Sequence, residues 1–215
     1  MSDALYHERL YRSAAVIQRL REFPVTVCGA GALGANLTES LARQGFACLK
    51  VIDRDRIEER NLSTQPYYRS DIGAYKAKIL ANALYRALGV SVEARAEELT
   101  AANAAKLLAG SGLVVDTFDN SRSRQIIKDC CTSLNLPCLH VGLAGDYAEI
   151  LWNEIYRVPS AGREDVCDYP LARNLVTLAV SIACEVLVAF TARQEQRSYT
   201  VTLGDFAIQP FEFEA

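Results

Sequence analysis

The stretch FPVTVCGAGALGANLTESLARQGFACLKVID, residues 23–53, decides the fold. It opens with a β-branched run at 25–27, passes through the glycines of GAGALG, and continues as an apolar-periodic segment at 35–44 that Gly45 ends. This order predicts a buried strand, a tight turn and a helix. The run CLKVID then predicts a second strand, which ends in acid at Asp53.

The glycines of this turn have the spacing GxGxxG. Gly29 permits the tight turn, Gly31 lets a phosphate approach the backbone, and Gly34 lets the helix pack close to the strand. The beginning of the helix offers unpaired N–H groups to an anion. Asp53, 19 residues after Gly34, is placed to accept both hydroxyls of a ribose. These features predict a nucleotide, adenosine in particular, and an NAD-dependent dehydrogenase would share them.

Length and composition describe one folded domain over residues 1–215, of which 50% are hydrophobic. The 23 Lys and Arg residues against 26 Asp and Glu give a net charge of -3, so nucleic acid is not expected as a partner. The apolar run 175–190 falls short of the roughly 20 residues that cross a bilayer, and it predicts a buried helix. The first ten residues lack the apolar segment of a secretory signal, so we expect a cytoplasmic protein without a membrane partner.

The rest of the chain alternates helix and strand patterns. An N-terminal helix is predicted over 4–22, and residues 54–73 form a long loop or short helical turns, a kind of segment that is usually functional. The pattern predicts an α/β, Rossmann-like fold: a mostly parallel sheet with helices on both faces and antiparallel strands added at one edge. The predicted helices are 74–88, 101–110 and 121–135, and the predicted strands are 90–94, 113–119, 138–142, 148–158 and additions within 198–214.

The seven cysteines are odd in number and lie mostly in apolar stretches. There is no CxxC pair, and the two histidines, His7 and His140, are far apart in the sequence. We expect most of these thiols to be buried, in a reducing compartment, and we expect no structural zinc.

Five short motifs in this order resemble a known family, the ThiF/MoeB/HesA adenylyltransferases related to ubiquitin-activating enzymes. They are Arg9-Leu10-Tyr11-Arg12, Asp53-Arg54-Asp55, Asn61-Leu62-Ser63-Thr64-Gln65, Asp71-Ile72-Gly73 with Lys76 three residues on, and Asp119-Asn120 with Arg124 four residues beyond.

The resemblance implies that ATP and Mg²⁺ activate the C-terminal glycine of a small ubiquitin-like or sulfur-carrier protein ending in Gly-Gly, with release of pyrophosphate. It also implies a homodimer. The resemblance implies that Lys76 is a cation on the phosphates, that Asp119 holds magnesium and that Asp53 binds the ribose. It implies that Asn61 and Asn120 contact phosphate or the substrate tail, and that Arg12 reaches across a two-fold axis into the partner's site. The other implied residues of the nucleotide site are Gly29, Gly31, Ala32, Gly34, Asp55, Gln65 and Arg124.

The chain departs from the family pattern at three places. Thr64 stands where the motif has an arginine that faces the triphosphate, and our hypothesis is that Arg60 or Arg69 supplies the missing charge. Ala32 stands where many members have glycine, which narrows the space by one methyl group. The zinc-binding CxxC pairs of many bacterial members are absent.

Cys167 lies about where a family cysteine accepts the activated carrier. Its neighbours Asp165 and Asp168 would raise a thiol pKa, which opposes a ready nucleophile. Two alternatives to the adenylyltransferase stay open: a catalytically silent relative that keeps the fold for dimerisation or partner binding, and an NAD-dependent oxidoreductase.

Overall fold

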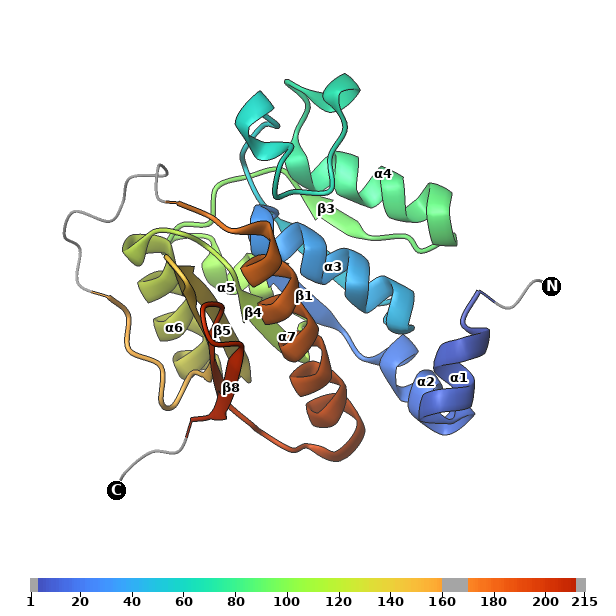
Figure 1. The fold of residues 1–215 in the computed structure, drawn as a ribbon. Coiled ribbons are helices and arrows are strands. Elements are labelled where there is room, and N and C mark those ends of the chain that lie inside the picture. Colours follow the sequence, from blue (N-terminus) through green and yellow to red (C-terminus); the bar gives the residue numbers. More distant parts are fainter. Residues whose placement is uncertain (1–3, 160–169, 212–215) are drawn as a thin grey trace.

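The computed structural model describes residues 4–159 and 170–211. These residues form one sheet of eight strands in the order β3-β2-β1-β4-β5-β6-β7-β8 (Figure 1). Neighbouring strands from β3 to β5 are parallel, and those from β5 to β8 are antiparallel. The strands are β1 Val25–Cys28, β2 Leu49–Ile52, β3 Glu93–Arg95, β4 Leu113–Asp116, β5 Cys138–Ala144, β6 Tyr147–Trp152, β7 Tyr199–Thr202 and β8 Ala207–Pro210.

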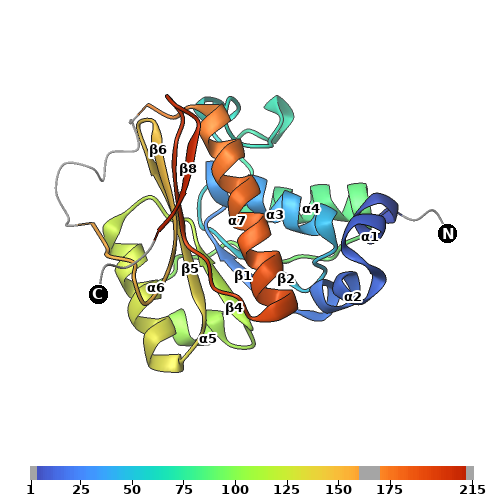
Figure 2. The ribbon, with the colours of Figure 1, turned by 60° about the horizontal axis from the view of Figure 1, so that its bottom comes forward.

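Helices cover both faces of the sheet (Figure 2). Val27 and Val115 belong to the hydrophobic cluster that contains α3 and α7, whereas Cys28 and Val114 belong to the cluster of α5 and α6. Successive strand residues therefore pack on opposite faces, and the predicted fold class is confirmed. The helices are α1 Tyr6–Arg12, α2 Ala14–Glu22, α3 Ala32–Gln44, α4 Lys76–Leu88, α5 Ala104–Leu108, α6 Ser121–Leu134 and α7 Arg173–Arg193, with the 3-10 turns η1 Glu59–Asn61 and η2 Arg69–Asp71 in the loop after β2.

The predicted N-terminal helix over 4–22 is two helices. Ser13 interrupts it with a φ of 77°, and the Ser13 hydroxyl accepts a hydrogen bond from the backbone N–H of Val16. Two other elements are shorter than predicted. The helical pattern at 101–110 forms a helix only at α5, and the strand pattern at 148–158 ends at Trp152, where a turn begins.

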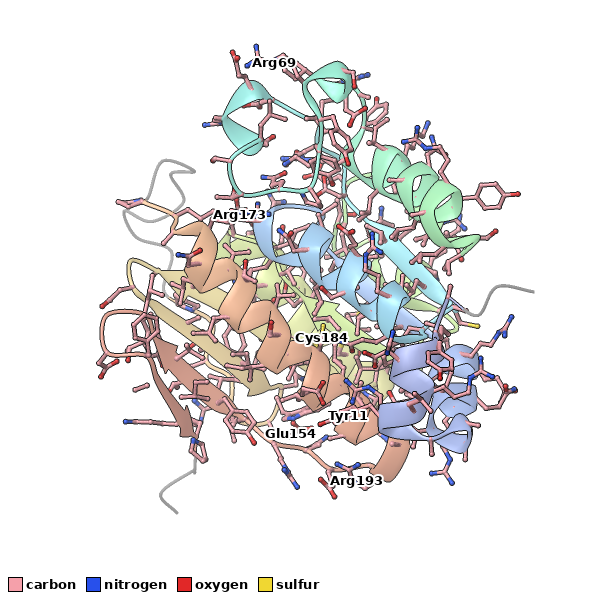
Figure 3. The ribbon with its side chains drawn as sticks, turned by 45° about the vertical axis from the view of Figure 1, so that its right-hand side comes forward. Tyr11, Arg69, Glu154, Arg173, Cys184 and Arg193 are labelled. Atoms are coloured by element: carbon pink, nitrogen blue, oxygen red, sulfur yellow. The ribbon has the colours of Figure 1, made fainter. Side chains whose placement is uncertain are left out.

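The apolar helix α7 has 21 residues, so the expectation that it is too short to cross a membrane was wrong. Its most apolar window is 72% buried inside the protein, as in a core helix. Cys184, labelled in Figure 3, is fully buried on α7 beside Ser40 and Gln44 of α3. The prediction of a buried helix is therefore confirmed, with a greater length.

Three helices begin where parallel strands end. α3 follows β1, α4 follows the loop after β2, and α6 follows β4. Ligands of open α/β sheets bind outside the carboxyl ends of the strands, so this edge is where a site is expected.

Candidate active site

The glycine-rich loop connects β1 to α3. Gly29 has a φ of 105°, which side chains rarely adopt. A Cβ atom on Gly34 would lie 2.1 Å from the carbonyl oxygen of Gly29, whereas a Cβ atom on Gly31 would meet nothing within 4 Å. The tight turn predicted at Gly29 and the close helix packing predicted at Gly34 are confirmed, and the approach of a phosphate at Gly31 stays a prediction with open space around it. Ala32 is the first residue of α3 and is half-buried.

Asp53 ties the end of β2 to this loop. Its side chain is 5% exposed, and its two carboxylate oxygens accept hydrogen bonds from the backbone N–H groups of Ala30 and Asp55, both at 2.6 Å. Burial raises the pKa of Asp53, and the nearby Lys76 ammonium and the two N–H groups oppose that rise. Each carboxylate oxygen keeps a further lone pair, so the predicted bond to ribose stays compatible with this geometry.

Lys76 begins α4 and is 8% exposed. Its Nζ atom lies 3.6 Å from Oδ2 of Asp55. The buried hydroxyl of Tyr67 donates to the carbonyl oxygen of Ala30 at 2.9 Å and lies 3.4 Å from that of Lys76. Tyr67 thus joins the glycine-rich loop to the beginning of α4. Sequence reasoning missed it, because a tyrosine in a long polar loop carries no distinguishing pattern.

The loop after β2 is fixed mainly by its own polar groups. The Asn61 side-chain oxygen accepts from the backbone N–H of Glu58, so Asn61 closes η1. Thr64 is 7% exposed, and its carbonyl oxygen accepts from Nδ2 of Asn36 on α3 at 2.8 Å. Gln65 is 8% exposed, and its Oε1 atom has no hydrogen-bond partner within the described residues.

The two arginines expected to replace the missing charge at Thr64 are paired with acids of the same loop. Arg60 contacts Glu58 at 2.6 Å, and Arg69 contacts Glu59 at 3.2 Å. Figure 3 shows Arg69 at the outer end of the loop, away from the beginning of α3. Its side chain is 80% exposed. Each arginine thus has an acid of its own loop beside it, and its role in replacing the missing charge stays a prediction.

The residues after β4 surround the beginning of α6. Asp119 is exposed, and Asn120 caps α6 by accepting from the backbone N–H of Ser123 at 2.9 Å. Arg124, in the first turn, is 9% exposed; its guanidinium donates to the Tyr156 hydroxyl at 2.8 Å and to the carbonyl oxygen of Val141 at 3.3 Å. Asn120 thus caps the beginning of α6, and Arg124 fixes it against β5.

A buried polar chain lies next to Arg124. Nδ1 of His140 lies 2.8 Å from Asp116, and its Nε2 lies 2.8 Å from the side-chain oxygen of Asn153. The Tyr156 ring stacks on His140 with centroids 3.9 Å apart. Residue spacing did not indicate this buried polar chain, because its residues come from three strands or their ends and meet only through the register of the sheet.

Arg12 is engaged within its own chain. Its guanidinium donates to Glu8 at 2.7 Å and makes two hydrogen bonds to Glu185 of α7. The predicted reach into a partner's site stays a prediction, since it requires this pair to open. Cys167, the remaining candidate, lies outside the described residues.

A hollow of about 740 Å³ lies beside the site. Residues of α3, α4 and the loop after β2 line it, together with Arg173 of α7; Gln65 and Arg86 are among them, but Asp53 and Lys76 are not. Among residues 4–159 and 170–211, no group of three or more His, Cys, Asp or Glu side chains is placed to hold a metal ion by itself.

Comparison with known proteins places this geometry in context. The model of the ThiF family matches residues 7–167. The sulfur carrier protein ThiS adenylyltransferase of Bacillus subtilis is 33% identical over 135 residues, 60% of this chain and 40% of that protein. The SAMP-activating enzyme E1 of Haloferax volcanii is 38% identical over 125 residues, 57% of this chain and 46% of that protein. The chain thus spans less than half the length of these curated relatives.

Solved structures show the same fold. A crystal structure of E. coli MccB with AMPCPP and selenomethionine MccA superposes with a TM-score of 0.85, covering 98% of this chain and 71% of that one at 16% identity. A structure of MccB with ATP gives a TM-score of 0.82 over 98% of this chain and 72% of that one, also at 16% identity.

Proposed function

Because the chain belongs to the ThiF family, we propose that it is an ATP-dependent adenylyltransferase acting on the C-terminal glycine of a small ubiquitin-like or sulfur-carrier protein. The names of the relatives from Bacillus subtilis and Haloferax volcanii support this substrate class. A carrier tail ending in Gly-Gly belongs to this proposal, because glycine has no side chain to hinder its approach to a phosphate.

One observation carries the proposal. The glycine-rich loop, Asp53 and Lys76 are joined at the carboxyl edge of the sheet: Asp53 bonds to Ala30 of the loop, and Lys76 lies close enough to oppose the rise in its pKa. An open backbone approach, a carboxylate for ribose and a buried cation form a site for a nucleoside polyphosphate.

The reaction joins two anions. A carboxylate oxygen of the carrier forms a bond to the α-phosphorus of ATP, the bond from that phosphorus to the bridging oxygen breaks, and pyrophosphate leaves with the electron pair. The backbone N–H groups at the beginning of α3 and the Lys76 ammonium are placed to offset the charge that develops. Arg124 donates to the carbonyl oxygen of Val141 and so fixes the beginning of α6 against β5, next to the site.

Magnesium fits the residues present. Mg²⁺ is usually bound by one or two carboxylates together with phosphate oxygens and water, so it needs no cluster of protein ligands. Asp119, exposed after β4, would hold it. When bound, the ion supplies positive charge to the phosphates during attack.

We further propose a homodimer in the cytoplasm. The exposed side chains of Tyr6, Leu10 and Tyr11 on α1 support an interface there. The six described cysteines are free thiols, as suits a reducing compartment.

Exchange of pyrophosphate into ATP in the presence of a candidate Gly-Gly carrier tests the function. The wild-type chain is expected to catalyse exchange, and Asp119→Ala is expected to lose it. Calorimetric binding of ATP without exchange by any carrier would favour the silent relative. Binding of NAD in preference to ATP would favour an oxidoreductase.

A further inference from the structure

Arg173 is the first residue of α7, and its Nη1 atom donates to the carbonyl oxygen of Ser63 at 3.3 Å. The side chain is exposed. Within the described part of the chain no carboxylate pairs with it, in contrast to Arg60 and Arg69. None of the described acids therefore neutralises its charge.

This charge lies next to Thr64. Asn36 donates from Nδ2 to the carbonyl oxygens of both Ala32 and Thr64, at 2.7 and 2.8 Å, and so binds the loop to the first turn of α3. Arg173 holds the preceding residue, Ser63. Figure 1 shows the beginning of α7 beside that of α3, and Figure 3 labels Arg173 at this place.

The helices that begin at this corner bring positive charge to it, and Asp55 is the acid that lies 3.6 Å from Lys76. The first turns of α3, α4 and α7 contain no acidic residue, although acids are favoured there. Two of these helices begin with a cation, Lys76 and Arg173, which the helix dipole disfavours. Unlike Lys76, Arg173 has no acid beside it among the described residues, so the beginning of α7 favours an anion.

We infer that Arg173 binds the β- and γ-phosphates of ATP and supplies the cation that Thr64 lacks. The inference rests on the proposed adenylation. A guanidinium can donate two parallel hydrogen bonds to phosphate oxygens, which a lysine cannot do. When the bond to the α-phosphorus breaks, the electron pair stays on the pyrophosphate, and Arg173 stabilises that leaving group.

Calorimetry with ATP and AMP on the full chain tests this role. Arg173→Gln is expected to weaken ATP binding about ten- to hundredfold, the usual effect of losing a charge-assisted contact. AMP lacks the outer phosphates, so its affinity is expected to stay unchanged. Arg86→Gln is the matched control, because Arg86 is an exposed arginine on the same hollow near the far end of α4. Arg173→Lys is expected to give an intermediate ATP affinity.

Three results would overturn the role of Arg173. One is an ATP affinity in Arg173→Gln equal to that in Arg86→Gln; another is equal weakening for ATP and AMP. The third is a loss of ATP affinity in Arg60→Gln or Arg69→Gln but not in Arg173→Gln. Failure of the wild-type chain to bind ATP would instead refute the adenylation proposal itself. Unfolding temperatures of all variants confirm that each one is folded.

Discussion

Two alanine substitutions in the glycine-rich loop should have opposite effects on the stability of the fold. Gly31 has φ and ψ of -80° and -153°, which alanine can adopt, and its Cβ atom would meet nothing within 4 Å. Gly31→Ala should therefore leave the fold intact and stabilise it by about 0.4–1 kcal/mol, because alanine restricts the unfolded chain. This corresponds to a rise in Tm of about 1–4 °C for a chain of this size.

Gly34→Ala should unfold at lower temperature. Its Cβ atom would lie 2.1 Å from the Gly29 carbonyl oxygen and 2.5 Å from Oγ1 of Thr117. Carbon–oxygen contacts normally begin near about 3.3 Å, so the beginning of α3 would have to move by about 1 Å. Overpacking of this kind costs about 1–3 kcal/mol, or about 2–12 °C in Tm.

The more stable variant, Gly31→Ala, should nevertheless bind ATP poorly. The methyl group of Gly31→Ala would fill the open approach to the N–H groups of α3, and we expect ATP affinity at least about tenfold weaker in a stable protein. Differential scanning calorimetry gives Tm, and titration calorimetry gives the ATP affinity. Wild-type ATP affinity in Gly31→Ala, or an unchanged Tm in Gly34→Ala, would refute the reasoning.

Three further predictions concern buried groups. Lys76→Met removes a cation that lowers the pKa of Asp53, so that pKa rises further above its unfolded value. A carboxyl whose pKa is raised in the folded protein contributes stability below its unfolded pKa, and this contribution is lost as pH rises through its folded pKa. The variant should therefore lose more stability at pH 7 than at pH 4.5 in urea unfolding. An equal loss at both pH values contradicts this. Tyr156→Phe removes an acceptor of Arg124 and should cost about 1–3 kcal/mol in thermal unfolding, whereas an unchanged Tm would show that the bond contributes nothing. Burial raises the pKa of Cys184 to about 12, so iodoacetamide at pH 8 should modify it only after unfolding; mass spectrometry of the folded chain tests this, and modification there would be contrary to expectation.

The sequence predicted what local pattern controls. The order of strand, glycine turn and helix placed Gly29 and Asp53 correctly at one edge of the sheet, because the turn permits few alternatives. Boundaries were less accurate where one residue decides them. Ser13 adopts a positive φ that ends a helix within a continuous helical pattern, and no local signal marks it.

Tertiary contacts determined what the sequence could not show. The pairing of Arg12 with Glu185 joins residues 173 positions apart. The link between Asp116 and His140 depends on the register of β4 against β5, in which these two residues are partners. Arg173 drew no attention in the sequence, because its neighbour across the fold, Ser63, precedes it by 110 positions. A lone arginine at the start of an apolar helix usually marks only the helix end.

The position of α7 in the chain has a consequence for synthesis. An apolar helix of 21 residues is an aggregation hazard whenever it leaves the ribosome without a surface to pack on. Here most of its packing surface, formed by α2, α3, β5 and β6, lies earlier in the sequence, and only β7 among these neighbours follows it. The order of translation therefore supplies most of this surface before the helix that covers it, and a circular permutant that places α7 first would expose that helix for most of its synthesis.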